Sequence, residues 1–221
     1  MHRRGKDAAV RVDRAFAFVD LCGFTAFTDR HGDERTVLVL AQLRSALRES
    51  AARRGVRVVK WLGDGAMLSS TMGDAICALV VELDHRMSDA LPSLPVRVGL
   101  ASGPVIMFEG DDYIGRSVNL AARLCDQAQA HELLAAAPLA RQASPWINVE
   151  SAGSTAVPGF HDAVDVCRLT LATDHDSVRD PICGLTIPAR AAYEGRAGTW
   201  FCSEACAGSW LDPRPDEPAA L

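Results

Sequence analysis

Short apolar runs and longer periodic segments alternate along the first 70 residues of the chain. Residues 15–19 form an apolar run typical of a strand, and residues 24–54 carry apolar positions at helical spacing. Residues 56–62 and 66–70 flank a Gly-Asp-Gly sequence of the kind that closes a hairpin. The pattern predicts a strand, a turn, a helix and then a hairpin with Asp64 at its tip.

The alternation continues through the middle of the chain. Residues 74–90 predict a second amphipathic helix, and residues 95–102 and 105–108 predict strands separated by a break at Gly103 and Pro104. A further helix and a set of closing strands are expected at residues 116–130 and 147–171. Interleaved helices and strands favour one α+β domain built on a single sheet.

The composition changes near the C-terminus. Residues 172–176 are polar and predict a linker, whereas residues 177–211 are rich in cysteine, glycine and aromatic residues. Residues 212–221 are rich in proline and predict a disordered tail. We therefore expect a main domain at residues 14–171 and a small second domain at residues 177–211.

Charge and hydropathy limit the classes of partner. The net charge is −5 and the basic residues form no stripe, so a nucleic-acid partner is not expected. No stretch approaches the roughly 18 apolar residues that cross a bilayer, and the basic residues 1–7 precede no apolar segment. A cytoplasmic protein without membrane contact is expected, and its seven cysteines favour reduced thiols or a metal site over disulfides.

Two acids lie where a strand gives way to a turn. Asp20 follows the first apolar run and precedes Gly23 and a helix, and Asp64 lies between two glycines. Taken singly, Asp20 is as well explained as a helix cap and Asp64 as a turn residue. If the two carboxylates meet across the sheet, they would hold two divalent cations suited to phosphoryl chemistry.

Four spaced segments together resemble the catalytic domain of class III adenylate and guanylate cyclases. They are residues 18–25 (FVDLCGFT), 60–65 (KWLGDG), 112–115 (DYIG) and 118–124 (VNLAARL). The resemblance covers about residues 14–171. It implies a ferredoxin-like α+β fold, with a central, mostly antiparallel sheet flanked by helices, and a reaction that converts ATP into 3′,5′-cyclic AMP and pyrophosphate.

The resemblance also assigns metal-binding and catalytic residues. It places the two metal-binding aspartates at Asp20 and Asp64, with the backbone carbonyl of Leu21 as a further contact. Two Mg²⁺ or Mn²⁺ ions per active site are implied. Asn119 corresponds to the residue that orients the ribose, and Arg123, one helical turn later, to the arginine that stabilises the transition state.

The base-recognition positions of the family fall on Lys60 and Asp112. A lysine donor and an aspartate acceptor match N1 and the 6-amino group of adenine, whereas guanine presents the reverse pattern. ATP is therefore expected over GTP. Because the family builds each site from two catalytic domains and this chain carries both sets of residues, a homodimer is implied.

Two features depart from the family pattern. No lysine or arginine lies between Arg141 and Arg168, where relatives carry a basic residue for the terminal phosphates, and the segment from Val105 to Asp112 is short. A catalytically silent domain that binds nucleotide or only dimerises, coupled to a metal-sensing module, is the alternative function. The four intact positions at Asp20, Asp64, Asn119 and Arg123 favour the enzyme.

The C-terminal region resembles a YHS domain, a small relative of the TRASH modules. Its residues Cys183, Cys202 and Cys206 form a possible second metal site for Zn²⁺ or Cu⁺, and such a site would let the module act as a metal sensor. A fourth ligand is not evident, because no histidine or cysteine lies between Cys183 and Cys202. Buried thiols that help to fill a small core are an equally good interpretation.

Overall fold

The computed structural model describes residues 10–108, 112–195 and 198–210. Contacts between residues divide the chain into two compact units, with the boundary between residues 172 and 173. The expected linker at residues 172–176 spans this boundary. The expected tail at residues 212–221 and the basic residues 1–7 lie outside the described residues.

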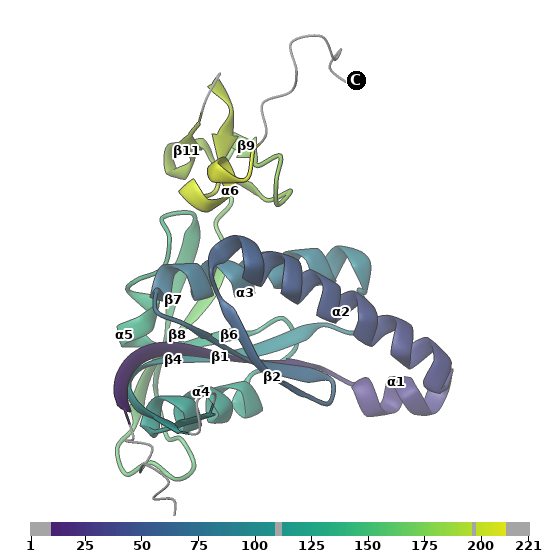
Figure 1. Ribbon diagram of the computed structural model, residues 1–221, viewed down its shortest axis with the longest axis vertical. Helices are drawn as coiled ribbons and strands as arrows, with labels where there is room; N and C mark the ends of the chain where they lie inside the picture. The colour runs from purple at the N-terminus through teal and green to yellow at the C-terminus, as the bar shows by residue number, and fades with distance from the viewer. Residues whose placement is uncertain (1–9, 109–111, 196–197, 211–221) are drawn as a thin grey trace, which may run out of the picture. The chain divides into compact units, whose positions relative to one another are not determined.

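The first unit is built on one mixed, mostly antiparallel sheet of eight strands (Figure 1). The strand order is β2-β3-β1-β4-β6-β8-β7, the β4–β6 pair is parallel, and β5 pairs with β4 beside this path. The strands are β1 (Val10–Leu21), β2 (Arg57–Leu62), β3 (Gly65–Ser70), β4 (Val96–Phe108), β5 (Asp112–Ile114), β6 (Leu133–Ala136), β7 (Ile147–Thr155) and β8 (Val164–Leu171).

Helices cover both faces of this sheet. Figure 1 shows α2 and α3 on one face and α4 on the other. The helices of this unit are α1 (Phe24–His31), α2 (Asp33–Arg54), α3 (Gly73–Ala90), α4 (Arg116–Gln127) and the single turn α5 (Ala137–Ala140). The predicted helix at residues 24–54 is interrupted at Gly32, whose positive φ of 80° ends α1.

The core lies on both sides of β1 because alternate residues of a strand point to opposite faces. Phe16 belongs to the cluster on the α4 face, where its ring meets Tyr113 edge to face. Ala15, Ala17 and Val19 alternate with it and are also buried. The part of β1 from Ala15 to Val19 is thus apolar on both faces, and Asp20 follows it near the end of the strand.

The predicted break at Gly103 and Pro104 is wrong, because β4 runs through both residues and stays paired with β1. On the side away from β1, β6 pairs only with residues 98–100 and β5 only with residues 106–108. A proline, which lacks an N–H group, is tolerated at such a gap in the ladder. Strand β6, which has only four residues, was not predicted from the sequence.

Close packing of α4 on the sheet depends on Gly99 of β4. A Cβ atom at this position would lie 2.1 Å from both the Ala121 carbonyl oxygen and the Cys125 amide nitrogen. Gly99→Ala should therefore lower the free energy of unfolding by about 1–3 kcal/mol, because two backbones would have to move apart. Urea unfolding measures the loss, and Gly208→Ala, where the space is open, is the control.

The second unit is small and rich in turns. It contains β9 (Ser177–Arg179) paired with β10 (Thr186–Pro188), the 3₁₀ turn η1 (Ala189–Ala191), β11 (Tyr193–Glu194) paired with β12 (Trp200–Phe201), and α6 (Glu204–Gly208). Its core consists of buried Leu185, Ile187, Phe201, Cys202 and Cys206. Across the described part of the chain, no helix combines the length and the apolar character needed to cross a membrane.

Candidate active site

The structure brings Asp20 and Asp64 to the same end of the sheet. Strands β1 and β3 pair so that Val19 lies opposite Ala66, which places the hairpin turn beside the end of β1. The turn uses Gly63 at φ 63°, and a Cβ on Gly65 would lie 2.3 Å from the Val19 carbonyl oxygen and 3.4 Å from Asp20 Oδ1. Glycine at position 65 therefore permits the close approach that places the Asp64 turn against Asp20.

The electrostatics of these two acids suit cations. Burial, and then the charge of the nearby Asp20 carboxylate, raise the pKa of Asp64. Asp20 pairs with the guanidinium group of Arg97. Its Oδ2 accepts hydrogen bonds from Arg97 Nε at 2.9 Å and from Arg97 Nη2 at 2.6 Å. Two carboxylates that repel each other form a donor set suited to Mg²⁺ or Mn²⁺, which prefer oxygen ligands.

Lys60 and Asp112 are brought together although they lie 52 positions apart in the sequence. Lys60 Nζ donates a hydrogen bond of 2.9 Å to Asp112 Oδ1, and the side chains are 43% and 53% exposed. This hydrogen bond, together with one from the Tyr113 amide, holds the pKa of Asp112 below its usual range. An exposed ion pair of this kind adds little to stability. The pair presents an ammonium donor and a carboxylate acceptor at the surface.

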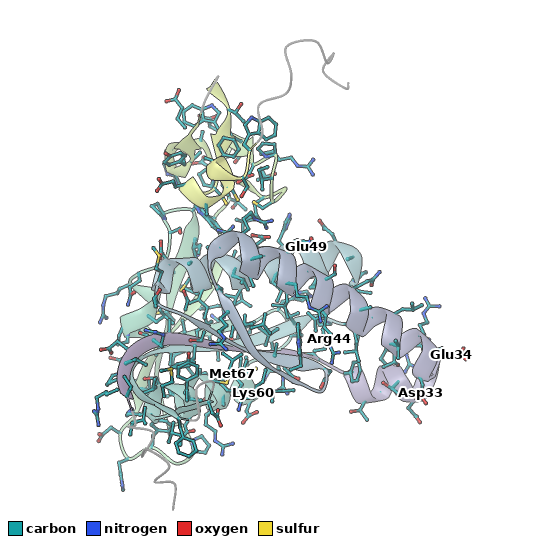
Figure 2. All side chains as sticks on the ribbon, in the orientation of Figure 1. Asp33, Glu34, Arg44, Glu49, Lys60 and Met67 are labelled. Carbon is teal, nitrogen blue, oxygen red and sulfur yellow. The ribbon has the colours of Figure 1, made fainter. Side chains whose placement is uncertain are left out.

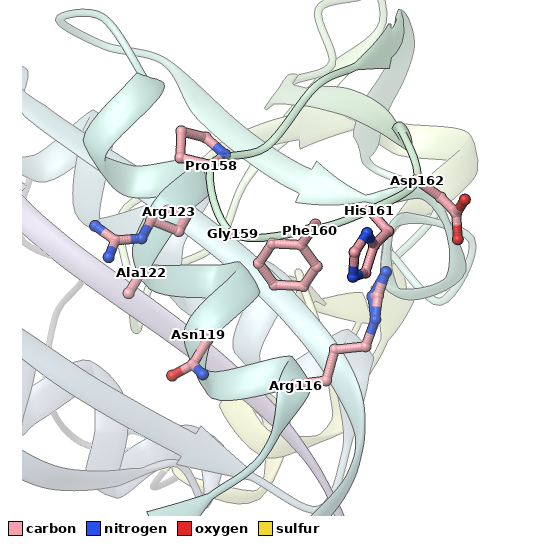
Figure 3. Close-up of a pocket in the computed structure, with 9 residues that line it drawn as sticks. All are labelled: Arg116, Asn119, Ala122, Arg123, Pro158, Gly159, Phe160, His161 and Asp162. Carbon is pink, nitrogen blue, oxygen red and sulfur yellow. The ribbon is translucent and has the colours of Figure 1, made fainter.

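Helix α4 presents a polar stripe to a cavity of about 660 Å³ (Figure 3). Arg116, Asn119 and Arg123 lie at positions i, i+3 and i+7 and therefore share one face of the helix. The opposite wall is the segment from Pro158 to Asp162. Within the described part of the chain, the lining of this cavity does not include Asp20 or Asp64.

Three basic residues near these groups were missed in the sequence analysis. Arg97 lies directly opposite Asp20 in the β1–β4 register. It is the one charged residue of β4, which was an available signal in the sequence. Arg116 stacks over the Phe160 ring at 4.6 Å, and His161 lines the same cavity. His161 lies in the interval between Arg141 and Arg168, where no lysine or arginine is found.

The C-terminal unit brings its three predicted cysteines together. Cys202 Sγ lies 3.6 Å from Cys183 Sγ and 3.5 Å from Cys206 Sγ, and all the cysteines are free thiols. Hydrogen bonds with Cys202 and Cys206, and then burial, raise the pKa of Cys183. Asp180 was missed in the sequence analysis, and its carboxylate lies within 4.8 Å of the three sulfur atoms.

Asp180 is fully buried and organises the loops that carry the thiols. Oδ1 accepts hydrogen bonds from the amides of Ile182 and Cys183, and Oδ2 accepts one of 2.7 Å from the Cys202 amide. The aspartate thereby fixes two of the cysteine-bearing segments. Its signal in the sequence is weak, because an aspartate before a proline is common in ordinary turns.

Sequence relatives of this chain include named cyclases. The chain is 30% identical over 207 residues to "Adenylate cyclase 2" of Rhizobium meliloti, a match that covers 83% of this chain and 57% of the relative. It is 34% identical over 140 residues to an uncharacterized protein of Mycobacterium tuberculosis, which covers 63% of this chain and 37% of the relative. The chain thus matches only part of the length of these relatives.

Structural comparison gives the same fold. The adenylyl cyclase CyaB from P. aeruginosa superposes with a TM-score of 0.65 at 23% identity, over 76% of this chain and 98% of that one. A bacterial light-regulated adenylyl cyclase superposes with a TM-score of 0.62 over 73% of this chain and 91% of that one. At such identities the likeness establishes the fold alone.

A family model described as the adenylate and guanylate cyclase catalytic domain matches residues 12–165. The matched range contains the acid pair, the Lys60–Asp112 pair and the polar stripe of α4. It ends before the C-terminal unit, so the resemblance of that unit to a YHS domain stays a prediction. Over most of its length, this chain belongs to the adenylate and guanylate cyclase catalytic domain family.

Proposed function

We propose that the chain is an adenylate cyclase that converts ATP into cyclic AMP and pyrophosphate. The observation that carries the choice of base is the Lys60–Asp112 contact of 2.9 Å. Lys60 can donate to N1 of adenine while Asp112 accepts from the 6-amino group. With guanine, the Lys60 donor would face the N1–H donor and the Asp112 acceptor would face the O6 acceptor. Such mismatched contacts strongly reduce the binding of the wrong base.

Asp20 and Asp64 are the groups that would hold two divalent cations, with the Leu21 carbonyl as a further ligand. When bound, Mg²⁺ or Mn²⁺ would lower the pKa of the ribose 3′-hydroxyl and would neutralise negative charge on the triphosphate. Arg97 adds a guanidinium beside Asp20. It is a candidate for the cationic phosphate contact, because no lysine or arginine lies between Arg141 and Arg168.

Asn119 and Arg123 would act at the reacting end of the nucleotide. Asn119 would orient the ribose through its amide, and Arg123 would place a permanent positive charge where negative charge develops on the α-phosphoryl group. Arg123 Nη1 lies 3.1 Å from Asp126 Oδ2, in a pair whose two side chains are more than half exposed. Such an exposed pair is weak and leaves the guanidinium able to turn toward a nucleotide.

A homodimer would complete the site. The acid pair lies at the end of β1, whereas Asn119 and Arg123 face the cavity under the Pro158–Asp162 segment. Antiparallel association of two chains would bring the acids of one chain to the α4 stripe of its partner. Each dimer would then contain two equivalent sites.

Cyclic nucleotide formation by the purified chain with Mn²⁺ tests the proposal. We expect cyclic AMP from ATP and much less cyclic GMP from GTP. Formation of neither product by a proven dimer would favour the alternative, a silent nucleotide-binding domain. Equal rates with both nucleotides would leave a cyclase and contradict the choice of base.

Exchanging the base-recognition pair should move the preference toward GTP. The double variant Lys60→Glu, Asp112→Ser supplies an acceptor for N1–H and a donor for O6 of guanine. We expect the ratio of kcat/KM for ATP to that for GTP to fall at least about tenfold. Steady-state kinetics with both nucleotides measure the change, and Asp13→Ser, on the same sheet but outside the site, is the control.

We further propose that Cys183, Cys202 and Cys206 bind one Zn²⁺ or Cu⁺ ion, with Asp180 holding their loops in place. Metal–sulfur bonds of about 2.3 Å fit sulfur atoms that lie 3.5 and 3.6 Å apart. Titration against a coloured chelator should give one ion per chain, and the Cys202→Ser variant should lose it. Cys167→Ser, in the first unit, should bind like wild type, and retention by Cys202→Ser would overturn the site.

A further inference from the structure

An irregularity in β2 sets the face of the sheet on which Lys60 lies. The β2–β3 pairing runs from Arg57 opposite Ser69 and Val58 opposite Leu68, and then shifts so that Lys60 lies opposite Met67. Val59 is the extra residue, as in a β-bulge. Because side chains alternate along a strand, one inserted residue moves every later side chain to the other face.

The register shows which face each residue takes. Met67 lies opposite Phe18 of β1, and both belong with the core on the α4 face of the sheet. Lys60, opposite Met67, therefore shares that face, and Val59 packs against the same core. Without the bulge, Val59 would lie opposite Met67, and Lys60 would point to the α2 face.

The next residue, Trp61, is held on the opposite face by two arginines. The guanidinium carbons of Arg44 and Arg48 lie 5.1 and 5.2 Å from the centre of the Trp61 ring. Both arginines come from α2, four residues apart, so they point toward the same patch of the sheet. We call Trp61, Arg44 and Arg48 the tryptophan clamp; Figure 2 labels Arg44 on α2 and Lys60 nearer the strands.

The helix that carries the two arginines is itself fixed. Glu82 of α3 is fully buried and accepts hydrogen bonds from Ser50 Oγ at 2.5 Å and from Arg54 Nε at 2.9 Å, both on α2. Breaking such a buried network is costly, so α2 is a rigid support for the clamp. The side of β2 that faces α2 is therefore anchored independently of the nucleotide site.

We propose that the bulge at Val59 and the tryptophan clamp are positioning devices for base recognition. The bulge places Lys60 on the face where Asp112 accepts its hydrogen bond, and the clamp holds the shifted register by keeping Trp61 on the α2 face. The exposed Lys60–Asp112 pair is too weak to impose this register by itself. Neither Trp61 nor the two arginines need touch the nucleotide, and the inference rests on the proposed adenylate cyclase function.

The test compares ATP with GTP in variants of the clamp. We test two variants, the double variant Arg44→Ala, Arg48→Ala and the single variant Trp61→Ala. In each, we expect the ratio of kcat/KM for ATP to that for GTP to fall about five- to tenfold, because each variant loses two cation–π contacts. The loss should arise mainly from KM for ATP, with kcat changed less than about twofold. Trp61→Phe, which keeps a ring, should retain most of the preference, and Arg35→Ala on the same helix is the matched control.

Variants that lack Lys60 show whether the clamp acts by positioning Lys60 or whether its loss damages the enzyme in general. In Lys60→Ala, adding the two arginine substitutions should change the nucleotide ratio no further, because the clamp acts through Lys60. A wild-type ratio in the folded arginine double variant, or an undiminished effect in the Lys60→Ala background, would overturn the proposal. A wild-type enzyme without any preference for ATP would instead contradict the assigned function.

Discussion

Replacing Asp64 by asparagine should reduce cyclase turnover by about a thousandfold or more while leaving the chain folded. The carboxylate is one of the two acids that would hold the divalent cations, and an amide oxygen is a much weaker ligand for Mg²⁺ or Mn²⁺. The nucleotide should still bind through Lys60 and Asp112, so the loss should lie in kcat. Turnover with saturating ATP and Mn²⁺ measures the effect.

The stability of this variant gives an independent check. Burial and the Asp20 charge raise the pKa of Asp64 in the folded chain. A raised folded-state pKa means that the ionised carboxylate opposes folding at pH values above its ordinary pKa. In the absence of metal, Asp64→Asn should therefore be at least as stable as wild type at neutral pH.

Asp29→Asn is the matched control, since Asp29 is an exposed acid on α1. It should keep wild-type turnover. Substantial cyclase activity in Asp64→Asn would contradict the assignment of the metal acids, and unfolding of this variant would contradict the electrostatic account of the pair.

The outline of the fold was accessible from sequence because its main signals are local. The Gly-Asp-Gly turn and its flanking strands follow from glycine and from alternating apolar positions. The continuation of β4 through Pro104 was not accessible, since it depends on which neighbouring strands reach that point. The bulge at Val59 depends likewise on the pairing of β2 with β3, and a single strand carries no mark of it.

The site shows the same division between local and long-range information. Asp20 and Asp64 are visible as acids at strand ends, but their juxtaposition depends on the β1–β3 register and on Gly65. Lys60 and Asp112 were assigned by resemblance, because nothing local connects residues 52 positions apart. Asp180 was missed because its role is to accept amide hydrogen bonds from segments that only the folded unit brings together.

Mixing two inactive variants should restore activity if the site is shared between chains. Asp64→Asn removes a metal acid, and Arg123→Ala removes the positive charge that stabilises the transition state, so each variant alone should be nearly inactive. In a mixed dimer, one of the two sites would take its acids and its arginine from undamaged chains. Random exchange makes half of the dimers mixed, so we expect about a quarter of wild-type activity.

The matched control is a mixture of Asp64→Asn with Asp20→Asn. Both changes damage the acid half of the site, so no mixed dimer contains an undamaged site and activity should stay near that of each variant alone. Successive purification through two different tags, one on each variant, establishes that mixed dimers form. Mixed dimers of Asp64→Asn and Arg123→Ala without recovered activity would show that one chain supplies both halves of its own site. In that case every site in the mixed dimer would contain one of the two substitutions.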